Sequence, residues 1–129
     1  MMARYMIPLK MPPREDALSS EDRRHLQAHF DANNFELNID GQIMEWNRID
    51  EIEVAKAART ASPAGWLVKN LVYGGADRYH VGVYSGHYEA VLPNLSLEAA
   101  RYVVQMIAYH LRDRVRYTGP EGITPLDES

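Results

Sequence analysis

Alternating apolar and polar residues between Phe35 and Glu45 predict a β-hairpin. Its turn is Asp40-Gly41, because Gly41 accepts the positive φ that a tight two-residue turn requires. With two residues in the loop, one face of the hairpin is nearly all apolar and consists of Phe35, Leu37, Ile39, Gln42, Met44 and Trp46. The other face is mostly polar, so the pairing register is well specified.

The apolar alternation changes phase after Trp46. An unbroken strand would point Arg48 inward, but the next apolar residues are Ile49, Ile52 and Val54. We interpret Asn47–Asp50 as a bend or bulge, followed by a strand that points Ile52 and Val54 inward. This change of phase indicates a curved sheet.

A second hairpin is predicted over Asp77–Leu92, with a loop at Ser85-Gly86. That loop pairs Gly82 with Glu89 and places His80 diagonally from Glu89. The expected inner face of this hairpin is apolar and consists of Tyr79, Val81, Val83, Tyr88, Ala90 and Leu92. The expected outer face is polar and consists of His80, Tyr84, His87 and Glu89.

Three side chains of that outer face, His80, His87 and Glu89, form a candidate polar cluster. Two imidazoles and a carboxylate can bind a divalent metal or act as acid and base. A solvated polar face with cross-strand pairs explains the same residues, and this is our preferred interpretation. The alternative function that the cluster suggests is a small ligand-binding or metal-dependent enzyme barrel.

Trp66–Tyr73 fits two kinds of element. It is a short apolar run that ends at Gly74-Gly75, as a buried strand does. Ser62-Pro63 and Gly74 also fit the beginning and the cap of a helix. The segment is too short for its periodicity to distinguish a strand from a helix, and the strand is our preferred interpretation.

The C-terminal part of the chain predicts an amphipathic helix that begins after Ser96, with Glu98 in its first turn. Its apolar stripe has helical spacing and consists of Leu97, Ala100, Val104, Ile107 and Leu111. Tyr102, Met106 and Tyr109 lie on the flank of this helix. Such an apolar flank suits self-association, or contact with the N-terminal segment of the same chain, and the sequence leaves both open.

We expect residues 1–33 to form an N-terminal extension, with a strand over Arg4–Met11 and a short helix capped within Ser19-Ser20. Residues 34–116 are expected to form the main domain. Residues 117–129 contain two prolines, two glycines and acidic residues, so we expect a loose tail.

In the short N-terminal helix, His25 and His29 are four residues apart, a spacing used by metal ligands. The glutamate of a metalloprotease helix is missing between them, and an exposed polar stripe is the preferred interpretation.

Charge and composition exclude several functions. The net charge of −4 argues against a general nucleic-acid-binding protein, whose binding surface would be basic. The absence of cysteine excludes disulfides, thiolate nucleophiles and cysteine-based metal sites. The sequence has no apolar run near the roughly 20 residues of a membrane helix, and its N-terminus lacks the apolar core of a signal peptide. We therefore expect a cytoplasmic protein without a cofactor and without membrane insertion.

The chain is expected to contain an extended hairpin, a strand with Trp46, Ile49, Ile52 and Val54, further strands and a final helix. In this order of elements, Asn34–Arg114 resembles the bacterial pleckstrin-homology-like domains. The resemblance implies an α+β fold, in which a strongly bent antiparallel sheet or partly open barrel is capped by one C-terminal helix.

Members of this family that bind phosphoinositides have basic residues around the first hairpin loop. Here that loop contains Asp40 and Gly41 and no base, so phosphoinositide binding is not expected. The function that we predict is a non-catalytic protein-interaction or self-assembly module, which acts through self-association or through a protein partner.

Overall fold

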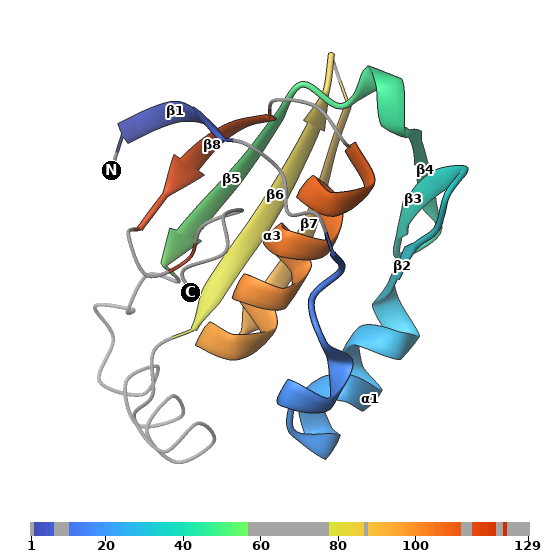
Figure 1. Ribbon diagram of the computed structural model, residues 1–129, viewed down its shortest axis with the longest axis vertical. Coiled ribbons are helices and arrows are strands. Elements are labelled where there is room, and N and C mark those ends of the chain that lie inside the picture. Colours follow the sequence, from blue (N-terminus) through green and yellow to red (C-terminus); the bar gives the residue numbers. More distant parts are fainter. Residues whose placement is uncertain are drawn as a thin grey trace, which may run out of the picture.

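Two β-sheets and one long helix make up the fold in the computed structural model, which describes residues 2–6, 11–56, 78–86, 88–111, 115–120 and 123 (Figure 1). The larger sheet has the strand order β1 (Met2–Met6), β8 (Val115–Gly119), β5 (Glu51–Lys56), β6 (Tyr79–Ser85) and β7 (Tyr88–Leu95). The smaller sheet has the order β2 (Phe30–Ala32), β3 (Glu36–Ile39) and β4 (Gln42–Glu45). Among the described residues, the helices are α1 (Ser20–His29) and α3 (Leu97–Leu111), with 3₁₀ turns η1 (Glu15–Ala17) and η2 (Trp46–Arg48).

The predicted fold class, an α+β fold with a C-terminal helix, is confirmed, and the two sheets do not close into a barrel. Every strand pair is antiparallel except β5 with β8, which is parallel. The resemblance to pleckstrin-homology-like domains stays a prediction.

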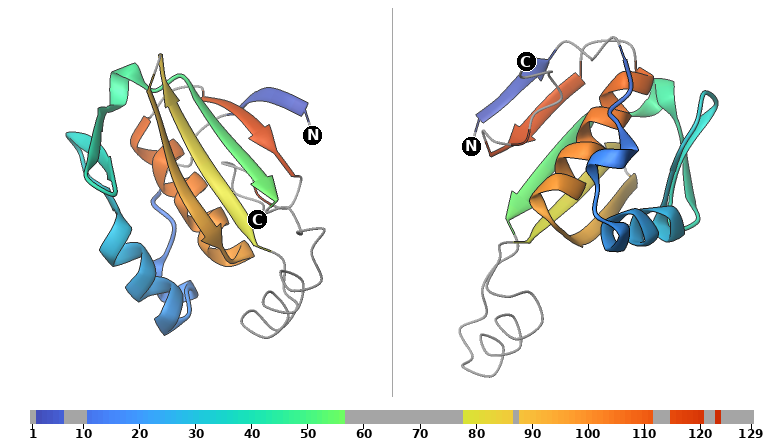
Figure 2. Two further views of the ribbon diagram at one scale, coloured as in Figure 1. Left: turned by 180° about the vertical axis from the view of Figure 1, so that it is seen from behind. Right: turned by 60° about the horizontal axis from the view of Figure 1, so that its bottom comes forward.

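Helix α3 covers one face of the five-stranded sheet, and α1 with η1 lies on the far side of α3 (Figure 2, right). The buried stripe of α3 consists of Ala99, Ala100, Val103, Val104, Ile107 and Ala108. It joins one hydrophobic core with the inward residues of the sheet, among them Ile52, Val54, Val81 and Val83. From the opposite side the same sheet is seen without a helix in front of it (Figure 2, left).

The first hairpin has the register that the alternation predicts: Leu37 pairs with Met44, and Ile39 pairs with Gln42. Both turn residues have positive φ, 53° at Asp40 and 87° at Gly41, as a tight hairpin turn requires. Leu37, Ile39 and Met44 are buried in the core, as the apolar face predicts.

The expected place of Phe35 on that apolar face was wrong. The strand begins only at Glu36, because the side-chain oxygen of Asn33 accepts hydrogen bonds from the N–H groups of Phe35 and Glu36 and turns the chain there. Phe35 is 85% exposed. Its expected partner, Trp46, begins η2 and donates from Nε1 to the Asn33 carbonyl oxygen at 2.6 Å.

The bend predicted at Asn47–Asp50 is confirmed. Turn η2 ends at Arg48, and β5 begins at Glu51 in the other sheet. Ile52 and Val54 are fully buried, so the change of phase moves the chain from one sheet to the next.

The second hairpin forms, but its register differs from the prediction by two residues. Tyr84 pairs with Glu89 and Ser85 with Tyr88, so Ser85 belongs to the strand and the turn comes later than predicted. Gly86 takes a φ of 61°, and its N–H donates to the Asp50 carboxylate at 2.7 Å, which fixes the later turn. A shift of two residues keeps each side chain on its predicted face.

Strand β7 continues to Leu95, past Pro93-Asn94, where the sequence suggested that it would end. The pairing with β6 is irregular there, and Asn94 has a φ of 58°. The Pro-Asn pair therefore makes a bulge in an edge strand and does not end it.

The N-terminal strand, expected over Arg4–Met11, is β1 at the edge of the larger sheet and lies earlier, at Met2–Met6. The short helix begins as expected, since the hydroxyl of Ser19 accepts a hydrogen bond from the Asp22 N–H at 3.1 Å.

The expectation of a loose tail over 117–129 was wrong for its first part. Residues Val115–Gly119 form β8, which lies between β1 and β5. Tyr117 is fully buried, and its hydroxyl donates to the carbonyl oxygen of Ile123, which is also buried. This strand was not predicted, because the basic residues near Arg116 are typical of the C-terminal end of a helix.

The three expected segments share one hydrophobic core, to which Leu18 and Leu26 contribute from the N-terminal part and Tyr117 and Ile123 from the C-terminal part. Trp66–Tyr73, for which strand and helix were both considered, lies outside the described residues. Among the described helices, none has the length and apolar character needed to cross a membrane.

Candidate functional site

The face of the five-stranded sheet that points away from α3, called the open face below, is not covered by any described helix or strand (Figure 2, left). Because side chains alternate along each strand, the residues opposite to the buried ones point to this face. From β5 and β6 these are Glu51, Glu53, Ala55, His80, Gly82 and Tyr84, and from β7 and β8 they are Glu89, Val91, Pro93, Arg116 and Thr118.

Tyr84 lies near the end of β6, next to the turn into β7, and its ring folds back along its own strand over Gly82. A Cβ atom at position 82 would stand 3.3 Å from the Tyr84 hydroxyl oxygen. The absence of a side chain at Gly82 therefore makes room for the phenol, which in turn buries Gly82.

Carboxylates lie on both sides of Tyr84. Glu51 on β5 and Glu89 on β7 pair directly with Tyr84, and Glu53 pairs with Gly82, over which the phenol lies. The pKa of Tyr84 is raised above its ordinary value by burial and then by the negative charges of Glu53, Glu89 and Glu51. The hydroxyl is therefore protonated at neutral pH.

Two of these three carboxylates have no ion pair within the described part of the chain. Glu51 accepts a hydrogen bond from the Thr118 hydroxyl at 3.0 Å and lies 3.9 Å from Nε of Arg116. Glu53 and Glu89 form no ion pair with a described residue. The surroundings of Tyr84 are therefore negative, and this negative charge is what an opposite charge on a binding partner would meet.

The predicted cluster of His80, His87 and Glu89 is not brought together by the described residues. His80 pairs with Ala55, and its Nδ1 accepts a hydrogen bond from the Asn94 N–H at 3.2 Å. Glu89 lies opposite Tyr84, four residues further along β6, or about 13 Å at 3.3 Å per residue. The expected diagonal neighbourhood was wrong because it depended on the earlier register.

His87 itself lies outside the described residues. Among the residues that are described, no group of three or more histidine, aspartate or glutamate side chains is arranged to hold a metal ion.

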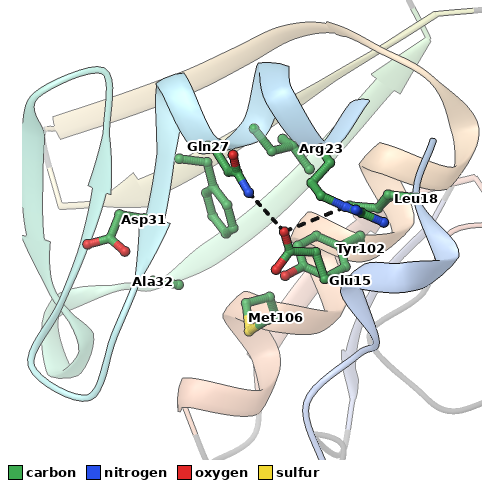
Figure 3. Close-up of a pocket in the computed structure, with 10 residues that line it drawn as sticks. Glu15, Leu18, Arg23, Gln27, Asp31, Ala32, Tyr102 and Met106 are labelled. Carbon is green, nitrogen blue, oxygen red and sulfur yellow. Dashed lines mark hydrogen bonds and ion pairs between the residues drawn. The ribbon is translucent and has the colours of Figure 1, made fainter. Parts of the chain in front are cut away.

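Tyr102 and Met106, two of the three residues on the flank of α3, line a pocket of about 200 Å³ between α3, α1, η1 and β2 (Figure 3). Glu15 from η1 reaches into this pocket, where it accepts a hydrogen bond from Gln27 Nε2 at 3.1 Å and lies 3.8 Å from Arg23 Nε. Tyr102 and Met106 thus face the N-terminal segment of the same chain, one of the two alternatives that the sequence left open.

The same pocket changes the chemistry of Tyr102. Burial, and then the charge of Glu15, raise the pKa of Tyr102 above its ordinary value. Glu15 already contacts two donors of α1. We therefore interpret the contacts around this pocket as structural ones that hold the N-terminal segment against α3.

The third residue of the flank, Tyr109, is half-buried, and its ring meets the His110 ring edge-on at a centroid distance of 5.1 Å. The His110 ring in turn stacks on Trp46, also at 5.1 Å. Tyr109 therefore belongs to an aromatic group that joins α3 to η2.

His25 and His29 lie on one face of α1 with ring centroids 4.8 Å apart. Nδ1 of His29 lies 2.5 Å from Oδ1 of Asp40 in the first hairpin turn. This contact connects the end of α1 to the hairpin, a tertiary relationship that helical spacing alone could not show.

Sequence reasoning named Tyr84 and Glu89 on the outer face, but it did not include Glu51 and Glu53 in a site. The signal was present, because Glu51, Ile52, Glu53 and Val54 alternate and put both carboxylates on the face opposite the core. What was missing was the pairing of β5 with β6, which joins residues far apart in the sequence.

The fold and this face together define an α+β domain with an open, acidic sheet face around one tyrosine. Comparisons of the chain with models of known families, with curated proteins and with solved structures found no match.

Proposed function

We propose that this protein is a non-catalytic interaction module that binds a positively charged segment of a protein partner on the open face. One observation carries the proposal: one whole face of the larger sheet has no described element over it, and on it Tyr84 lies between Glu53 and Glu89, which form no ion pair with a described residue.

The residues of the open face suit protein binding. An aromatic residue with polar residues around it is a common arrangement in protein interfaces. Val91, which pairs with Gly82, is 39% exposed and adds apolar surface beside Tyr84. Glu53 and Glu89 would favour a basic partner over an acidic one and would speed its association.

Site-specific crosslinking tests this proposal. A photoreactive amino acid replaces Val91 on the open face, and a matched control places it at Arg24, which is exposed on α1. In cells of the source organism, we expect a discrete crosslinked partner from position 91 that is absent from position 24. The adduct should disappear when Glu53→Lys and Glu89→Lys are added to the same chain.

Two results would contradict the proposal: identical adducts from positions 91 and 24, or an adduct at position 91 that persists after both charge reversals. Circular dichroism of the charge-reversed chain tests whether it still folds. We expect an unchanged spectrum, since both carboxylates lie on the surface of the sheet.

Self-association is the second candidate function, favoured by the apolar side chains exposed on the smaller sheet and on the bend before β3. Phe35 is 85% exposed and Ile43 is 59% exposed. If they form an interface between copies, light scattering at tens of micromolar protein should show a dimer that Ile43→Lys dissociates. A monomer under these conditions would exclude this candidate.

A further inference from the structure

We propose that the open face recognises an arginine of the partner, with its guanidinium stacked on the Tyr84 ring and bonded to Glu53 and Glu89. This inference rests on the proposed function, and it names the side chain that the same face selects.

The sheet places the two carboxylates on opposite sides of the ring. Glu53 is on β5 and Glu89 is on β7, the two strands that flank β6. Neighbouring strands are about 4.8 Å apart, and Glu53 pairs with Gly82 while Glu89 pairs with Tyr84, two residues or about 7 Å further along, so their backbones are separated by roughly 12 Å diagonally across the ring. A group centred over the ring is within reach of both side chains.

The position of Tyr84 leaves one side of its ring for a ligand. Its distal end lies on the backbone at Gly82, so the ring follows the strand and does not project into solvent. No described helix or strand covers this face of the sheet, and Tyr84 is only partly buried, so part of its ring is open to a ligand. An aromatic side chain held in this way offers a platform for a cation.

The chemistry of this arrangement favours arginine over lysine. A guanidinium is planar, stacks on aromatic rings, and spreads five N–H donors in a fork that can reach carboxylates on two sides. A lysine ammonium is compact and strongly hydrated, so it gains less from the ring and reaches one carboxylate at a time. An anionic ligand such as a phosphate would be repelled by all three glutamates.

The chain itself contains one arginine that supports this reading. Arg116 lies on the open face with its Nε 3.9 Å from Glu51 Oε2. It occupies the third carboxylate next to Tyr84, and the remaining two, Glu53 and Glu89, are the pair that flanks the ring.

Nuclear magnetic resonance of the full chain tests the inference with three blocked peptides of sequence Gly-Gly-X-Gly-Gly, where X is arginine, lysine or citrulline. At low salt, we expect the arginine peptide to shift the backbone amides of Glu53, Gly82, Tyr84 and Glu89. Its dissociation constant should be about threefold lower than that of the lysine peptide, as expected for an exposed cation–π contact. Citrulline, which is neutral, should not bind.

Two variants and one control locate the effect. Tyr84→Leu should remove the preference for arginine over lysine, and the double variant Glu53→Gln, Glu89→Gln should abolish binding of both peptides. Glu36→Gln, which removes a carboxylate from the smaller sheet, should leave both affinities unchanged.

The outcomes separate this inference from the proposed function. Equal affinity for arginine and lysine, with shifts on the open face, would overturn the arginine preference and leave the interaction module standing. Absence of shifts on this face, while the crosslink at position 91 persists, would also overturn the arginine site alone. Loss of both signals would overturn both proposals.

Discussion

Tyr84 occupies the space that a side chain at Gly82 would take, with its hydroxyl oxygen 3.3 Å from the position of a Cβ there. This relationship fixes the direction of the phenol, because a ring lying along its strand needs a neighbour two residues away that has no side chain. The shape of the open face therefore depends on the absence of a side chain at Gly82.

Replacing Gly82 by alanine should change the open face more than the stability of the fold. The new methyl group would push the Tyr84 ring off the strand, while the backbone gains the β-strand preference that glycine lacks. We expect the free energy of unfolding to change by less than about 1 kcal/mol. The arginine peptide should bind more weakly, as measured by the amide shifts of Glu53 and Glu89. Unchanged peptide binding would show that the ring does not need this position.

Removing the charge of Glu53 should lower the pKa of Tyr84 toward its ordinary value, because Glu53 makes the largest charge contribution to the rise. Ultraviolet titration of tyrosine ionisation in Glu53→Gln measures this change, with Tyr84→Phe identifying the signal of Tyr84. Glu36→Gln is the matched control and should leave the titration unchanged. A Tyr84 titration that is the same in Glu53→Gln and the wild type would place Glu53 away from the phenol.

The stability of the protein should fall as the pH rises above about 10, the ordinary pKa of tyrosine. Tyr84 and Tyr102 have raised pKa values in the folded protein, so they keep their protons where the unfolded chain loses them. Their contribution is constant below the unfolded pKa and is lost as the pH passes through the folded values. Urea unfolding from pH 8 to 11 measures the effect, which should be smaller in a chain with Tyr84→Phe and Tyr102→Phe.

Ser96→Ala should destabilise the protein by about 1–2 kcal/mol. The hydroxyl of Ser96 accepts a hydrogen bond from the Ala99 N–H at 3.1 Å and donates one to the Asp22 carboxylate at 2.7 Å, so it caps α3 and connects it to α1. Urea denaturation measures the loss. Ser20→Ala, an exposed serine in the first turn of α1, is the matched control and should cost much less. Equal losses for the two serines would contradict the capping role.

Tyr117→Phe tests whether the C-terminal strand is held as described. The phenylalanine keeps the buried ring but leaves the Ile123 carbonyl oxygen without the hydroxyl donor. The expected cost is about 1–3 kcal/mol, the usual cost of a buried acceptor that loses its partner. Thermal unfolding measures it, with Tyr88→Phe, which is 70% exposed, as the control. A melting temperature equal to that of the wild type would place Tyr117 outside the core.

The local elements were predictable from the sequence where one residue pattern determines them. Asp40-Gly41 set the first hairpin and its register, Ser19 and Ser96 marked the beginnings of two helices, and the phase change after Trp46 located the bend. In each case neighbouring residues decide the structure, so local physical chemistry is sufficient.

Other features depended on contacts between distant residues. Ser85 is paired in the second hairpin and is not a loop residue, because Asp50, the residue before β5, accepts a hydrogen bond from the Gly86 N–H. Strand β8 was not predicted, because its segment is short and lies next to arginines. It forms a strand because it lies between β1 and β5 in the sheet. The carboxylates around Tyr84 likewise meet only after β5 pairs with β6.

The position of β8 has a consequence for how the chain folds. β1 has its only described sheet neighbour in β8, which comes from the other end of the described chain. The five-stranded sheet thus cannot be completed from one end, and β1 gains its described partner only after residues 7–114, which separate the two strands in the sequence, have brought them together. Such long-range pairing slows folding, so we expect β5, β6, β7 and α3 to assemble first and β8 and β1 to join them as the last step.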